Sequence, residues 1–182
     1  MSFSAALIIF FIALLMSAFF SGYETGFVSA NPLRVRHLAE DEAAPRAVGL
    51  VRYLDNPDRT LAVLLVGNNI ANVAGTIAMA GLFSELAVHW FGEAADRWSV
   101  LMTAVVTAPI LLIFGEIVPK SVFRAHPTRL ALALLPAIRA FDFVFAPVAV
   151  PVAWLTHLFF RGEGRESQHI SPLMSTREDV RS

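Results

Sequence analysis

The sequence contains no cysteine and carries little charge. Without thiols there is no disulfide framework, no thiolate metal site and no thiol chemistry, and cysteine usage gives no indication of the compartment. Asp, Glu, Lys and Arg together make up 16% of the 182 residues, and the formal net charge is −1. A chain with so small an excess of either charge is not expected to bind nucleic acid.

Apolar side chains dominate what is present. Hydrophobic residues account for 56% of the chain and the mean hydropathy is +0.61. Three long apolar segments, at about residues 3–30, 61–90 and 98–119, are each long enough to span a bilayer as a helix. No basic region precedes the first segment and polar residues follow it, so a cleaved signal peptide is disfavoured. The sequence predicts an all-α membrane protein with three transmembrane helices and additional helices at the membrane surface.

The flanking segments are expected to lie beside the membrane. Residues 31–60 open on an Asn-Pro pair and contain a second one, which predicts a surface helix or helical hairpin. Residues 120–160 complete a membrane domain over residues 1–160. Within them, residues 130–160 are apolar enough to span, but they contain three prolines together with Arg139 and Asp142. We therefore favour a belt of broken interfacial or re-entrant helices over a fourth span. The polar residues 161–182 are expected to begin a cytosolic region.

Basic residues indicate the orientation. They cluster after the first and third segments, whereas the loop between the second and third segments contains only Arg97. The positive-inside rule then places the N-terminus outside and residues 31–60 and the C-terminus in the cytoplasm of a multi-pass cell (inner) membrane protein. The residues that decide this are Arg34, Arg36, Arg46, Arg52, Arg59, Lys120, Arg124 and Arg129.

Polar side chains form a stripe on each of the first two segments. Ser17, Ser21 and Glu24 follow i, i+4, i+7 spacing, which places them on one helical face. The second segment carries three amides and a hydroxyl within two turns: Asn68, Asn69, Asn72 and Thr76. Serines that bond to their own helix, and asparagines that bond between helices, are the structural alternatives. The stripes together favour a polar cavity.

The third segment ends in an ionisable group at membrane depth. Glu116 follows Gly115 and precedes Pro119. Pro119 has no N–H to donate to the carbonyl four residues earlier, so a helix that continues through it leaves the Gly115 carbonyl free. An acid in a membrane span is by default a functional-site hypothesis.

These ligands are all oxygens, since no His or Cys lies on the stripes. Carboxylate, carbonyl, amide and hydroxyl oxygens suit Mg²⁺, with Ca²⁺ or Na⁺ less favoured, and they disfavour zinc, copper and iron. One carboxylate only half neutralises a divalent ion, so either Glu24 contributes or binding is kept weak, as suits a transporter. No nucleophile with a partnered base lies on the spans, so an enzyme is not expected.

Three stretches carry a family resemblance: SAFFSGYETG at 17–26, GNNIAN at 67–72 and GEIVPK at 115–120. They resemble the signature stretches of the transmembrane domain of the CorC/CNNM family of magnesium transporters. The resemblance implies sodium-coupled Mg²⁺ export by a homodimer in the lipid bilayer. It also implies a cation held by Ser17, Ser21, an Asn among Asn68, Asn69 and Asn72, and Glu116 with Gly115. Family members normally continue into a cytosolic CBS-domain pair that binds ATP, which this stretch of chain does not include.

Two other functions stay open at this point. A magnesium-sensing membrane scaffold would bind the ion without moving it. A proton-coupled carrier would use the titration of Glu116 and keep its pH dependence without magnesium.

Overall fold

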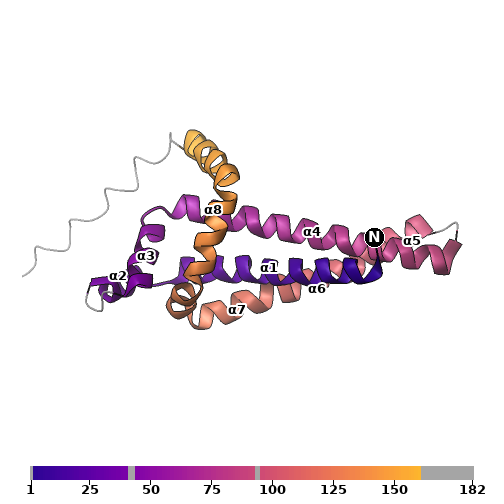
Figure 1. The fold of residues 1–182 in the computed structure, drawn as a ribbon, viewed down its shortest axis with the longest axis horizontal. Helices are drawn as coiled ribbons and strands as arrows, with labels where there is room; N and C mark the ends of the chain where they lie inside the picture. The colour runs from indigo at the N-terminus through magenta and orange to yellow at the C-terminus, as the bar shows by residue number, and fades with distance from the viewer. Residues whose placement is uncertain (1, 41–43, 93–94, 161–182) are drawn as a thin grey trace, which may run out of the picture.

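The computed structural model describes residues 2–40, 44–92 and 95–160, and the regular elements within them are all helices. Three helical stretches are long and apolar enough to cross a membrane: Phe3–Ser29, Pro57–Trp90 and Trp98–Ala125. They run along the long axis of the molecule (Figure 1). The predicted all-α fold with three spans is therefore confirmed. The expected cytosolic beginning at residues 161–182 lies outside the described residues.

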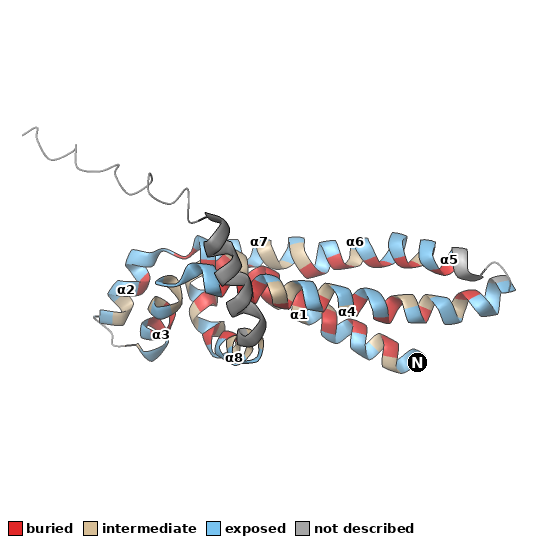
Figure 2. Cartoon of the chain, turned by 90° about the horizontal axis from the view of Figure 1, so that it is seen from above, coloured by how far each residue is buried: buried red, intermediate tan, exposed pale blue. Residues whose placement is uncertain are grey.

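The first span, α1 (Phe3–Ser29), packs against both of the others. It contacts α4 (Pro57–Phe91) along much of its length, and it also contacts the last part of the third span. Its second half is the most buried part, with Phe20 and Tyr23 fully inaccessible. Figure 2 shows buried residues concentrated where α1 meets its neighbours and exposed residues along the outer faces. These exposed faces are apolar, as expected of surfaces that face lipid.

The third span is not a regular α-helix. It runs through α5 (Ala95–Met102), η2 (Thr103–Thr107), α6 (Ala108–Ile110), η3 (Leu111–Ile117) and α7 (Val118–Ala125), of which η2 and η3 are π-helical. The two π segments flank Pro109, which has no N–H for an α-helical bond, and the wider π turn accommodates this break. The helix also continues through Pro119 to Ala125, beyond the expected end at residue 119.

The surface helices gather at one end of the bundle. Residues 31–60 form α2 (Pro32–Glu40) and α3 (Pro45–Leu54) and then enter α4, which begins at Pro57. Here lies the main apolar core, made by Phe20, Tyr23, Phe27, Val35, Leu50, Leu64, Phe123, Ala131, Leu135 and Ile138. Each of the helices α1, α2, α3, α4, α7 and α8 (Pro127–Phe160) contributes to this core, so the surface helices are anchored to the spans.

The segment expected to be a belt of broken helices is a single helical element, α8 (Pro127–Phe160). The expectation of separate short helices is wrong here, because the helix continues through all three prolines. α8 runs across the bundle axis in both views (Figures 1 and 2). The buried Tyr23 hydroxyl of α1 donates to the Ala131 carbonyl of α8 at 3.2 Å, which ties α8 to the first span.

Candidate cation site

The polar cluster is centred on Ser17, which is fully buried in the middle of α1. Its Oγ lies 3.0 Å from Asn68 Oδ1 and 2.7 Å from Asn72 Oδ1, both on α4. The same Oγ lies 3.4 Å from the Gly115 carbonyl oxygen in η3. Four oxygens from three spans therefore meet at one point.

This cluster contains more acceptor oxygens than hydrogen-bond donors. A serine hydroxyl has one proton, so Ser17 can donate to only one of its three oxygen neighbours at a time. The amide of Asn72 is oriented by its Nδ2, which donates to Glu116 Oε1 at 3.3 Å, so its Oδ1 faces Ser17. Crowded oxygens without enough donors are costly when buried. A small cation would offset that cost.

The close approach of the third span to α1 depends on Gly115. A Cβ at this position would lie 2.8 Å from Ser17 Oγ, closer than such atoms normally come. With no side chain here, the Gly115 carbonyl can join the cluster. The sequence predicts that the Gly115 carbonyl is free of an α-helical hydrogen bond, and this carbonyl does lie against Ser17. The backbone here is not the α-helix on which that prediction was based, because Gly115 and Glu116 lie in a π-helical turn. Single π turns occur frequently at functional sites.

Glu116 brings the only carboxylate that contacts the cluster among the described residues, and it does so through Asn72. Glu116 is half-buried, whereas Gly115 beside it is buried. The carboxylate therefore borders the cluster and keeps one side toward open space. That position suits a group that helps a cation to lose water as it enters the cluster.

The structure does not bring every predicted residue into the cluster. Ser21 is buried one turn from Ser17, and its Oγ has no hydrogen-bond partner among the described residues. Asn69 is exposed on a different face of α4 from its neighbour Asn68. Glu24 is half-buried and forms no hydrogen bond or ion pair with any described residue. Of the three candidate asparagines, the geometry selects Asn68 and Asn72.

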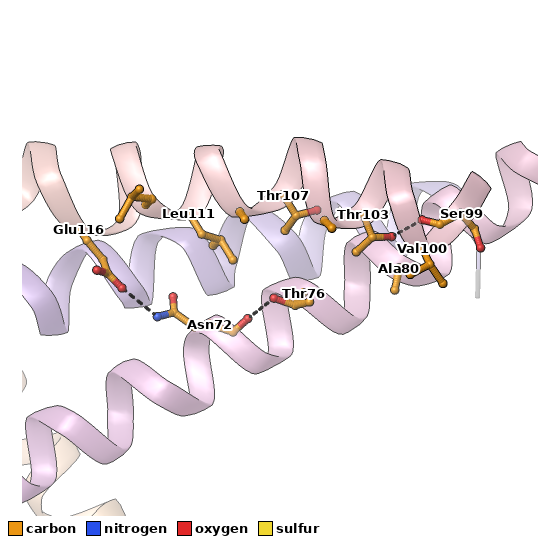
Figure 3. Close-up of a pocket in the computed structure, with 12 residues that line it drawn as sticks. Asn72, Thr76, Ala80, Ser99, Val100, Thr103, Thr107, Leu111 and Glu116 are labelled. Carbon is orange, nitrogen blue, oxygen red and sulfur yellow. Dashed lines mark hydrogen bonds between the residues drawn. The ribbon is translucent and has the colours of Figure 1, made fainter. Parts of the chain in front are cut away.

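A cavity of about 510 Å³ leads from this cluster along the third span. Figure 3 shows Glu116 and Asn72 at one end and Ser99 at the other. Between them lie Thr76 of α4 and the threonines of η2, and the remaining lining is aliphatic. Ser99 belongs to α5, at the end of the bundle where Figure 1 labels that helix. The cavity thus joins the cluster to one end of the bundle.

The threonines of this cavity were missed by the sequence analysis. Ser99, Thr103 and Thr107 follow i, i+4, i+8 spacing, a signal that was available in the sequence. Thr103 Oγ1 donates to the Ser99 carbonyl at 2.7 Å. Thr107 is 1% exposed, and its Oγ1 has no partner among the described residues. An unpaired buried hydroxyl on the wall of a cavity is available to a ligand or to water.

The described residues contain no group of three or more His, Asp or Glu side chains that could hold a metal. A site of the zinc type is therefore absent from that part of the chain. The oxygen cluster offers neutral ligands and one carboxylate instead, which is a donor set for a hard cation that is bound reversibly.

Three membrane-length helices with a buried polar cluster between them define a multi-pass membrane protein. Residues 8–182 match the family described as the cyclin M transmembrane N-terminal domain, CNNM. The chain belongs to this family, which is a family of transmembrane domains. The resemblance seen in the three sequence stretches is thereby confirmed.

Individual relatives agree with this assignment. The chain is 29% identical to the UPF0053 inner membrane protein YfjD of Escherichia coli, over 92% of this chain and 37% of the relative. It is 30% identical to a UPF0053 protein of Haemophilus influenzae, over 86% of this chain and 34% of the relative. It is 23% identical to the metal transporter cnnm-4 of Caenorhabditis elegans, over 83% of this chain and 31% of that protein. The chain thus spans about a third of the length of these relatives.

Replacing the carboxylate tests the cation site directly. We expect Glu116→Gln to weaken magnesium binding about 100-fold, or about 3 kcal/mol, because it removes a formal charge in a poorly hydrated position and keeps the shape. Isothermal titration of the purified chain measures this. Glu85→Gln is the matched control, since Glu85 is an exposed acid on α4 that contacts neither the cluster nor its cavity. Unchanged affinity in a folded Glu116→Gln protein would place the site elsewhere, with Glu24 as the next candidate.

Proposed function

We propose that this chain is the membrane domain of a magnesium transporter, with the cation held between the three spans. The observation that carries the proposal is the meeting of Ser17, Asn68, Asn72 and Gly115 oxygens around one buried point. No two of the three spans could supply this set alone, so a cation bound here depends on how the helices are packed. A site of that kind couples ion binding to helix movement.

The spacing of the oxygens supports magnesium as the ion. Mg²⁺ prefers octahedral geometry with oxygens at about 2.0–2.1 Å, so neighbouring ligand oxygens lie about 2.9 Å apart. The distances from Ser17 Oγ to its three neighbours are 3.0, 2.7 and 3.4 Å, which bracket that value. This spacing is compatible with magnesium, and the resemblance to a family of magnesium transporters makes it the ion that we propose.

The charge of the site supports transport over storage. One half-buried carboxylate, Glu116, only half neutralises a divalent ion, so the bound state keeps a net positive charge. Such a site releases its ion readily, as conduction and transport require. The hydroxyl-lined cavity supplies a route along which a hydrated cation can approach it.

Other parts of the proposal rest on family membership. A relative is named as a metal transporter. From the family resemblance we propose sodium as the coupling ion, Mg²⁺ export as the direction, and a homodimer as the assembly. We propose also that the whole protein includes a cytosolic CBS pair, because the relatives are about three times as long as the matched stretch.

Flux through reconstituted protein separates transport from binding. We expect proteoliposomes containing the chain to move magnesium, and Ser17→Ala to reduce the flux about tenfold because a ligand is lost. A magnesium-sensitive dye inside the vesicles reports the rate. A protein that binds magnesium without any flux would be the sensing scaffold. A pH-driven flux that persists without magnesium would indicate the proton-coupled carrier.

The cavity route has its own test. Thr107→Val preserves the shape of the side chain and removes the unpaired hydroxyl, so a cation passing along the cavity loses one polar contact. We expect the flux to fall severalfold while equilibrium magnesium affinity changes little. Thr128→Val, a threonine outside the spans and outside this cavity, is the matched control. A loss of affinity equal to the loss of flux would make Thr107 a ligand and not part of a route.

The orientation can be tested with single cysteines, since the chain has none of its own. We expect an impermeant thiol reagent applied to intact cells to label cysteines at Ser2 and His89 but not at Arg46 or Ser175. Ser2, His89 and Arg46 are exposed in the structure. Labelling at Arg46 would reverse the orientation, and labelling at Ser175 together with Ser2 would make α8 a fourth span.

A further inference from the structure

A second polar cavity, of about 470 Å³, lies where the end of α3, the start of α4 and the middle of α8 meet. It is separate from the cation cavity and shares no lining residue with it. Its wall differs in kind, because it is dominated by arginine. The polar residues that line it are Arg52, Tyr53, Asn56, Arg59, Thr60, Arg139 and Asp142.

The charges of this cavity do not balance. Arg59 Nη2 donates to both carboxylate oxygens of Asp142, at 3.1 and 3.2 Å, and the Tyr53 hydroxyl donates to the same carboxylate at 3.4 Å. Asp142 is thereby committed to Arg59 and Tyr53. Arg52 and Arg139 form no hydrogen bond or ion pair with any described residue. Two guanidinium groups on one cavity wall repel each other unless an anion lies between them.

The position of Arg139 is built into the fold. Gly49 lies on α3 directly opposite this side chain, and a Cβ at position 49 would overlap the Arg139 guanidinium nitrogen Nη2. The absence of a side chain at Gly49 leaves the space in which the guanidinium of α8 rests against α3. The two elements therefore present Arg52 and Arg139 to the same cavity.

Neutral donors add to the arginines. Burial raises the pKa of Tyr53, and the nearby Asp142 raises it further, so the phenol keeps the proton that it donates to Asp142 and is not a donor to a ligand. Asn56 precedes α4 and makes no side-chain cap to it, so its amide is available. The cavity also borders the N-terminus of α4, a 35-residue helix whose positive dipole end favours anions. Forked guanidinium groups and helix N-termini are the donors that recognise phosphate oxygens.

The depth of the cavity points to a lipid as the source of the phosphate. It lies at the beginning of the second span, Pro57–Trp90. Apolar side chains near this level are exposed: Leu65 of α4 by 53% and Phe143 of α8 by 84%. Basic pockets between helices at a membrane surface are suited to anionic head groups. We propose that this cavity binds the phosphate group of an anionic phospholipid, whose acyl chains lie against the exposed apolar side chains of α4 and α8.

Lipid retention by the purified chain tests the proposal. The protein is placed in phosphatidylcholine micelles with or without phosphatidylglycerol, and bound phosphatidylglycerol is measured by native mass spectrometry. We expect Arg52→Gln/Arg139→Gln to retain about tenfold less phosphatidylglycerol, because charge-assisted hydrogen bonds to phosphate are lost. Neither arginine has a partner among the described residues, so the melting temperature in phosphatidylcholine alone should not change.

The matched control removes two arginines elsewhere at the same end of the molecule. Arg46→Gln/Arg124→Gln alters exposed residues on α3 and α7 that do not line the cavity, and it should retain the lipid as the unaltered protein does. Equal loss in both double variants would show general charge attraction and overturn the proposal. Equal retention by all three proteins would overturn it as well.

Two further measurements isolate the geometry and the source of the phosphate. Gly49→Ala keeps every charge but displaces the Arg139 guanidinium, so it should also lower retention; full retention would remove Arg139 from the site. Inorganic phosphate should not stabilise the protein in phosphatidylcholine micelles. It should also not displace phosphatidylglycerol from the micelles that contain it. Stabilisation by inorganic phosphate, with no preference for phosphatidylglycerol, would identify a free phosphate site and overturn the lipid assignment.

Discussion

The buried hydroxyl of Ser17 holds the three spans in register. Its Oγ is within 3.5 Å of acceptor oxygens from α4 and from η3, and its single proton can satisfy only one of them at a time. The cavity that reaches Asn72 and Glu116 can bring water or a cation to the oxygens that this proton does not satisfy. The apolar core around Phe20 and Tyr23 holds the helices together at one end. The packing of the three spans and the grouping of these oxygens are therefore one constraint.

The π-helical turns of the third span determine which groups reach that point. A π turn adds backbone relative to an α turn, so it rotates the residues that follow it around the helix axis. η3 contains both the Gly115 carbonyl and the Glu116 side chain, and η2 contains the buried Thr107. Pro109 lies between the two segments. Along this irregular span, the Glu116 carboxylate and the threonine hydroxyls of η2 line one cavity, while the Gly115 carbonyl lies against Ser17.

Much of this arrangement could be predicted from the sequence. The length of the apolar segments predicted the three spans, and an acid beside a glycine and a proline indicated a candidate cation site at Glu116, which stays a prediction. The choice between Asn68 and Asn69 could not be made, because neighbouring residues differ by about 100° around a helix and only packing decides which faces inward. The π register of the third span and the continuity of α8 through its prolines also depend on tertiary contacts. The regular spacing of Ser99, Thr103 and Thr107 is visible in the sequence, but uncharged hydroxyls alone do not indicate a functional site.

The order of residues along α4 explains how the two polar cavities remain distinct. Arg59 borders the arginine cavity, Leu64 lies in the apolar core, and Asn68 and Asn72 belong to the cation cluster. Arg59 and Asn72 are about 20 Å apart along the helix, and the charge of Arg59 is paired with that of Asp142. The layer containing Leu64 and Phe20 also lies between the cluster and the arginine end, whereas the cavity opens from the cluster toward α5. In the transporter that we propose, a cation would enter from the α5 end without displacing the core, and its release past the other end would require Leu64 and Phe20 to move apart, as alternating access demands.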